Sequence, residues 1–108
     1  MKVRTLIVIA SSLSISAPAF AADEGETLFK NSGCGTCHTL GKPGIGPSLK
    51  DIAAKYAGDK KAQAMLEKKV RSGGSGSFPS MPMPMPPTAA SVSDASIKSM
   101  VTWMLSLK

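Results

Sequence analysis

The two cysteines and the single histidine of the 108-residue chain stand together at Cys34–His38, which reads Cys-Gly-Thr-Cys-His. Cys-x-x-Cys-His is the attachment pattern for c-type haem. Two intervening residues let both sulfurs reach the two vinyl groups along one ring edge, and the next residue presents an imidazole to the iron from the same turn. The spacing predicts one haem c, bound covalently by Cys34 and Cys37, with His38 as an axial ligand.

Zinc binding and thiol redox chemistry are the other common uses of a Cys-x-x-Cys pair. A zinc site needs about four ligands, so two of them would have to come from seven scattered carboxylates. A thioredoxin-like site needs a strand before the motif within a βαβ unit, and no segment alternates apolar and polar residues as a strand does. Both alternatives fit the chain less well than haem attachment.

A second axial ligand is predicted in residues 73–92, a segment rich in Gly, Ser, Pro and Met that contains the run Met81–Pro87. A thioether opposite a histidine is an established ligand pair for haem iron. Alternating prolines restrict the backbone and lower the entropy cost of holding a sulfur there. Three methionines, Met81, Met83 and Met85, are candidates for one position. A flexible linker and a Met-rich Cu(I) site are the alternatives, but copper alone leaves Cys34–His38 unexplained.

Four helical segments are expected to position these groups, and no strand is expected. They cover about Asp23–Asn31, Leu49–Ala57, the stretch between Asp59 and Gly73, and Ser93 to the C-terminus. Expected N-caps of the last three are Ser48, Asp59 and Ser93, and expected stops of the first three are Gly33, Gly58 and Gly73. Pro47, nine residues after His38, offers a rigid carbonyl that can hold the second ring nitrogen of the imidazole.

Composition limits the chain to one small domain with little core of its own. Only five residues are aromatic, which is few for a domain of this size, so a bound prosthetic group is expected to fill the middle. The net charge of +6 makes the chain basic without approaching a nucleic-acid binder. There is no second histidine, and we find neither clustered carboxylates nor a nucleophile beside a base, so no catalytic site is predicted.

Residues 1–21 have the pattern of a cleavable signal peptide. Lys2 and Arg4 give a positive start, Leu6–Ile15 is apolar, and Ala19-Phe20-Ala21 has small residues where a signal peptidase reads. An uncleaved anchor is the alternative, but the apolar core is about half the roughly 20 residues that a spanning helix needs. We therefore expect residues 22–108 to form the mature domain, without stable membrane insertion.

The landmarks of this sequence resemble those of the small bacterial class I cytochromes c of the c-551/c-552 type. They are Leu28–Asn31, Cys34–His38, Gly46–Pro47, Pro82–Pro87, Val92–Asp94 and Trp103–Ser106, in the order of that family. The resemblance implies an all-α fold in which about four short helices wrap around one covalently attached haem. It also implies that the N- and C-terminal helices cross, with Phe29 against Trp103.

For the site, the resemblance implies that His38 is the proximal ligand and that Pro47 accepts a hydrogen bond from its imidazole. Met85 becomes the distal ligand, because the family places Pro-Pro directly after that methionine. Met83 remains the alternative, since the loop carries extra residues on both sides of Met85.

Departures from the family concern the groups around the haem. Thr88 stands where the family often has an Asn that donates to the ligand sulfur. Lys69 and Phe78 stand where family members commonly place Arg and Trp near a haem propionate. Lysine can still pair with a propionate as a point charge, whereas Phe78 has no donor to offer.

The resemblance implies a monomeric periplasmic electron carrier that cycles Fe(III)/Fe(II) between a membrane cytochrome complex and a terminal reductase or oxidase. Its basic charge suggests redox partners with acidic docking surfaces, such as an oxidase, a nitrite reductase or a peroxidase, and no nucleic acid. Lys42, beside the haem motif, is the first lysine to test. The alternatives are a gas-binding or weakly peroxidatic haem module, if the loop methionine does not bind, and a Met-rich copper protein, if haem is absent.

Overall fold

The computed structural model describes residue 12 and residues 20–108. The described part contains the helices α1 (Phe20–Asn31), α2 (Leu49–Lys55), α3 (Ala62–Ser72) and α4 (Asp94–Leu105), and the 3₁₀ turn η1 (Cys34–Thr36). Within it there is no strand, only an isolated bridge between Gly74 and Met85. The expected signal peptide, residues 1–21, lies outside the described residues apart from Ser12, Phe20 and Ala21.

Two of the expected N-caps are confirmed. The Ser48 hydroxyl accepts a hydrogen bond from the backbone N–H of Asp51 at 3.1 Å at the start of α2, and Ser93 does the same for Ser96 at 3.1 Å at the start of α4. The Asp59 carboxylate instead accepts from the N–H of Lys61 at 2.9 Å, so it caps the turn before α3 rather than the first turn of the helix itself.

The helix ends differ from expectation in three places. α4 ends at Leu105 rather than at the C-terminus. α1 begins at Phe20 rather than near Asp23, and α2 ends at Lys55, two residues before its expected end. The chain then turns through Gly58, which has a φ of 76°, and the N–H of Asp59 bonds to the Tyr56 carbonyl at 3.1 Å. This tight turn takes up the residues that were expected to extend α2.

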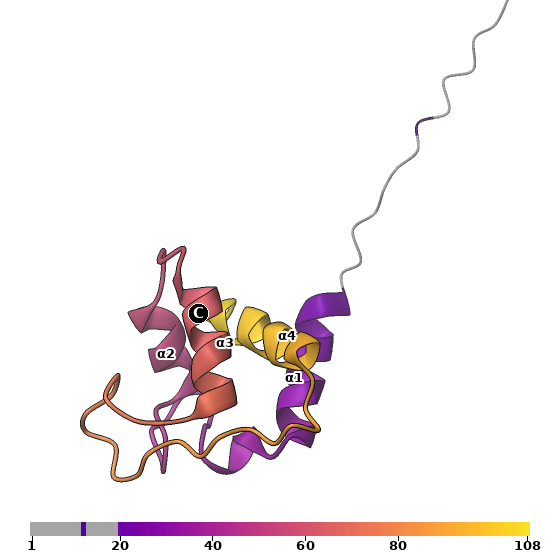
Figure 1. Ribbon diagram of the computed structural model, residues 1–108. Coiled ribbons are helices and arrows are strands. Elements are labelled where there is room, and N and C mark those ends of the chain that lie inside the picture. The colour runs from indigo at the N-terminus through magenta and orange to yellow at the C-terminus, as the bar shows by residue number, and fades with distance from the viewer. Residues whose placement is uncertain (1–11, 13–19) are drawn as a thin grey trace, which may run out of the picture.

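The N- and C-terminal helices cross closely, with α1 lying against α4 (Figure 1). The rings of Phe29 and Trp103 meet there with centroids 5.3 Å apart and planes tilted by 51°, a contact worth about 0.5–1.5 kcal/mol beyond area burial. The expected crossing and its aromatic pair are confirmed. Around it α2 and α3 complete the core, whose buried apolar residues are Leu49, Ile52, Ala53, Ala62, Leu66, Ile97, Met100, Val101, Trp103 and Met104.

No helix in the described part of the chain is both long enough and apolar enough to cross a membrane.

Gly25 sets the distance between α1 and α4. A Cβ atom at this buried position would lie 2.3 Å from the Ser99 carbonyl oxygen and 2.6 Å from the Cβ of Trp103. We expect Gly25→Ala to lower the free energy of unfolding by about 1–3 kcal/mol through overpacking, which is a fall of several degrees in Tm for a domain of this size. Thermal unfolding of the holoprotein checks this.

Gly41→Ala is the matched control, because a Cβ at Gly41 meets nothing within 4 Å. A Gly25→Ala variant as stable as this control would show that the two helices can move apart without cost.

Candidate functional site

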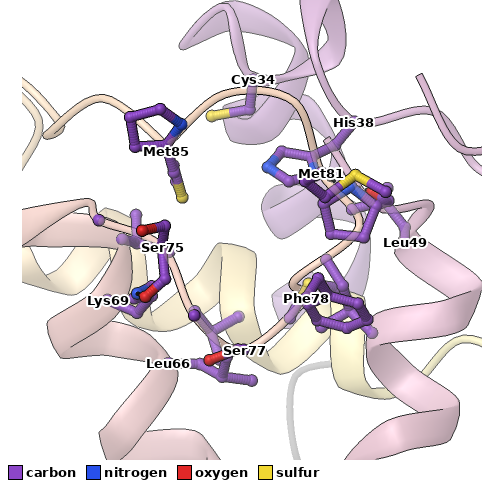
Figure 2. A pocket seen from close by; sticks show the side chains of 18 of the residues that line it. Cys34, His38, Leu49, Leu66, Lys69, Ser75, Ser77, Phe78, Met81 and Met85 are labelled. Atoms are coloured by element: carbon purple, nitrogen blue, oxygen red, sulfur yellow. Dashed lines mark hydrogen bonds between the residues drawn. The ribbon is translucent and has the colours of Figure 1, made fainter. Parts of the chain in front are cut away.

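A cavity of about 450 Å³ lies between the helices and the loop that follows α3. Its walls are mainly apolar side chains from α2, α3 and α4: Leu49, Ile52, Leu66, Val70, Met100, Val101 and Met104. Figure 2 shows the cavity from close by, with Cys34, His38 and Met85 among the residues around it. Most of the site residues expected from the sequence are gathered here.

The turn η1 brings the cysteine–histidine motif to the cavity. The N–H groups of Cys37 and His38 both bond to the Cys34 carbonyl, at 3.3 and 3.0 Å, after Gly33 has ended α1 with a φ of 77°. Cys34 and His38 line the cavity, whereas Cys37 is half-buried and outside the lining. Burial raises the pKa of the Cys34 thiol, mainly by desolvation of its thiolate form. The sequence predicted that the motif forms one turn, and the structure shows that this turn is a short 3₁₀ helix.

The His38 imidazole is held by the segment that precedes α2. Its Nδ1 atom lies 2.9 Å from the Pro47 carbonyl oxygen, and because a carbonyl can only accept, Nδ1 is the nitrogen that carries the proton. Nε2 therefore keeps its lone pair for a metal. A Cβ at Gly46 would lie 2.8 Å from Cε1 and 2.9 Å from Nδ1, so glycine is needed for the backbone to pass this close to the ring.

Met85 is held by the only backbone bridge in the described part of the chain. Its N–H bonds to the Gly74 carbonyl at 2.9 Å, and its carbonyl accepts from the Gly74 N–H at 2.8 Å. A Cβ at Gly73 would lie 2.3 Å from the same Met85 carbonyl oxygen, so the loop packs tightly on the end of α3. The structure thus fixes the Met85 backbone against α3.

The three candidate methionines have different environments. The half-buried Met85 points into the cavity from the side opposite the His38 ring (Figure 2). Met81 is also half-buried but lies on the His38 side. Met83 is 61% exposed. All three methionines line the cavity, and Figure 2 shows the Met85 side chain across the cavity from the His38 ring.

Thr88 bonds to the backbone of α3. Its hydroxyl lies 2.6 Å from the Val70 carbonyl oxygen, and its N–H is shared between the carbonyls of Val70 and Arg71, at 3.3 and 3.2 Å. A hydroxyl has one hydrogen to donate. Thr88 donates it to the Val70 carbonyl and therefore has none for a sulfur.

One end of the cavity is polar. Lys69, Ser75 and Ser77 lie at the end away from Cys34 (Figure 2). The half-buried Lys69 donates to the Ser75 carbonyl at 3.1 Å. Sequence reasoning missed Lys55, whose Nζ lies 4.7 Å from the centre of the Phe78 ring and 2.5 Å from the Ser77 carbonyl oxygen, because no local pattern links residues this far apart in the chain.

This arrangement fits a flat, largely apolar macrocycle with a metal at its centre and acidic groups on one edge. The walls are apolar, an imidazole and a thioether face each other, a cysteine lies at one end, and an ammonium lies at the other. It does not fit zinc, since no three His, Cys, Asp or Glu side chains gather into a metal-binding group among the described residues. Haem c suits the donor set.

Comparisons with known proteins agree with this chemistry. The cytochrome c family model matches residues 22–108. The chain is 38% identical to cytochrome c-551 of Pseudomonas aeruginosa and 39% identical to cytochrome c-552 of Nitrosomonas europaea, each over the full length of both chains. The crystal structure of wild-type Nitrosomonas europaea cytochrome c552 superposes with a TM-score of 0.70 at 42% identity, covering 77% of this chain and 99% of that one.

The solved structure confirms the class I cytochrome c fold expected from the sequence. The relatives are small electron carriers rather than enzymes, and the family carries one covalently attached haem c. The chain belongs to the cytochrome c family of electron-transfer proteins.

Proposed function

We propose that this protein is a periplasmic electron carrier whose haem c is attached through Cys34 and Cys37 and ligated by His38 and Met85. The observation that carries the proposal is the opposition of the Pro47-bonded imidazole and the half-buried thioether across one apolar cavity. When bound, the haem supplies a one-electron Fe(III)/Fe(II) couple. The residues of the chain provide the iron ligands, the apolar surroundings of the haem and the surface at which redox partners dock.

The protein holds both ligands so that little has to move when an electron arrives or leaves. The Pro47 carbonyl keeps the imidazole in one tautomer and one orientation. The Gly74 bridge keeps the Met85 backbone in place. Apolar walls limit the entry of water. A closed site of this kind leaves no open position for a substrate, which favours electron transfer over catalysis at the metal.

The propionates of the haem would lie at the polar end of the cavity. Lys69 offers the charge and Ser75 and Ser77 offer hydroxyls. Phe78, where relatives commonly have a tryptophan, has no donor. This end of the site therefore depends on lysine and serine in place of arginine and tryptophan.

Export is part of the proposal. Residues 1–21 have the pattern of a signal peptide, and the family match starts at residue 22. This agreement supports removal of residues 1–21 and a mature periplasmic domain of residues 22–108.

Partners are proposed to be redox proteins with acidic docking surfaces. A membrane cytochrome complex would reduce this monomeric carrier, and a terminal oxidase, nitrite reductase or peroxidase would oxidise it. Directly after the haem motif, the exposed Lys42 lies between Leu40 and Ile45, which are 50% and 47% exposed. A basic residue among exposed apolar ones suits a brief encounter, with charge for steering and apolar contact for docking.

The ligation is tested by carbon monoxide binding to the reduced holoprotein, made in a host with haem-maturation machinery. We expect the parent protein and Met83→Ala to show a c-type spectrum that carbon monoxide leaves unchanged, because the site is closed. Met85→Ala is expected to bind the gas readily, because it opens the distal position. Absorption spectra before and after addition of the gas provide the measurement.

Other outcomes would support the alternative functions or the alternative ligand. Ready binding by the parent protein would favour the gas-binding or peroxidase function. Binding by Met83→Ala but not by Met85→Ala would assign Met83 as the ligand, and a protein that takes up no haem would favour the copper function.

Electrostatic docking is tested by Lys42→Glu. We expect this variant to slow electron transfer to an acidic redox protein several-fold at low salt, and the difference to fade near 1 M salt, where the Debye length is about 3 Å. Stopped-flow rates measured against ionic strength check this.

Lys60→Glu is the control, since this exposed lysine belongs to the turn between α2 and α3. Figure 1 shows that turn on the opposite side of the molecule from the loop after α3. Equal slowing by both variants would mean that only net charge matters, and no slowing would remove Lys42 from the docking surface.

A further inference from the structure

The chain after Met85 is tied back to the last turn of α3 at Thr88. This residue makes three backbone-directed contacts there, through its hydroxyl to Val70 at 2.6 Å and through its N–H to Val70 and Arg71 at 3.3 and 3.2 Å. Thr88 lies three residues after Met85, so its position restricts where the methionine can go.

Arg71, in the same turn of α3, ties down the next part of the chain. Its guanidinium donates to the carbonyls of Ala89 at 3.1 Å and Val92 at 2.6 Å. It also pairs with Asp94 at 2.8 Å, but the Asp94 side chain is 95% exposed, and such surface pairs contribute little. The two carbonyl bonds are therefore the main contribution of Arg71.

Met85 and the residues that follow it are thus both attached to the end of α3 and the residues just after it. The Gly74 bridge holds its own backbone, and the bonds of Thr88 and Arg71 hold the residues that follow. When a thioether leaves a metal, its chain segment must move away, and attachments at Met85 and directly after it reduce the conformations that the segment can reach. They thereby disfavour the dissociated state.

We propose that Thr88 and Arg71 are positioning residues that keep Met85 in the ligand position by fastening the chain to α3, rather than by a hydrogen bond to the methionine sulfur. The inference rests on the proposed function, in which Met85 is the distal ligand. The hydroxyl of Thr88 is already used on the Val70 carbonyl, which leaves it no hydrogen for a sulfur.

Imidazole titration of the ferric holoprotein tests this inference, because imidazole must displace the thioether to bind. Thr88→Val keeps the shape of the side chain and removes the hydroxyl. We expect it to lower the apparent Kd for imidazole about two- to tenfold, the effect of losing one hydrogen bond. Thr88→Ser keeps the hydroxyl and is expected to restore the parent value.

Thr102→Val is the matched control. Its exposed hydroxyl also donates to a backbone carbonyl, that of Lys98 at 2.8 Å, and lies 3.4 Å from the Gln63 side chain in the first turn of α3, at the opposite end of that helix from Val70. We expect the imidazole Kd of this variant to equal that of the parent protein. Arg71→Gln provides a second variant, expected to lower the Kd in the same direction, in case Thr88→Val does not fold.

The outcomes separate the inference from the proposed function. Met85→Ala sets the Kd for a fully open site, and a parent protein that binds imidazole equally tightly would overturn both. If the parent binds more weakly than Met85→Ala, but Thr88→Val matches the parent, only the inference is overturned. A changed reduction potential in Thr88→Val with an unchanged Kd would likewise overturn it, and would assign the hydroxyl to the sulfur.

Discussion

The apolar cavity between the helices is the constraint on which the rest of the structure depends. Leu49, Ile52, Leu66, Met100 and Val101 belong to the core and also line the cavity. Large apolar cavities are costly in a folded protein because their walls lose contacts. A chain with five aromatic residues cannot fill such a space with its own side chains, so the flat apolar surface of a haem supplies the missing packing. Cofactor binding and folding are therefore coupled in this domain.

The two proposed iron ligands are supported in different ways. His38 depends on local structure, since a short turn and the carbonyl of Pro47, nine residues later, fix its ring. Met85 depends on contacts between distant parts of the chain, through the Gly74 bridge and through Thr88 on the end of α3. Segments with few buried residues open more readily than the packed core, and no residue of 73–92 is fully buried. The methionine side is therefore where we expect the closed site to be weakened without unfolding of the protein.

The polar end of the cavity combines an aromatic ring that cannot donate a hydrogen bond with lysine and serine side chains that can. Phe78 brings no hydrogen-bond donor, yet Lys55 reaches from α2 to lie over its ring and bond to the neighbouring Ser77 carbonyl. Lys69 and two serines lie nearby. The loop is thus attached to α2, and this end of the site carries a cationic side chain.

Features set by neighbouring residues could be determined from the sequence alone. Cys-x-x-Cys-His places two sulfurs and an imidazole within one turn whatever surrounds them, and the capping by Ser48 and Ser93 depends on residues three positions away. The apolar stripe of α4 and its aromatic contact with α1 also follow from periodicity and from the family resemblance.

Only the tertiary structure distinguished the three similar loop methionines and showed which groups Thr88 contacts. Met81, Met83 and Met85 have nearly the same neighbours in sequence, so what distinguishes Met85 is tertiary: the bridge to Gly74 holds its backbone, and its side chain lies across the cavity from His38. Thr88 stands at the position where, by the family resemblance, an Asn often donates to the sulfur, and its hydroxyl bonds to Val70 because the chain after Met85 returns to the end of α3. Such choices depend on contacts between segments far apart in the chain, which local residue spacing does not encode.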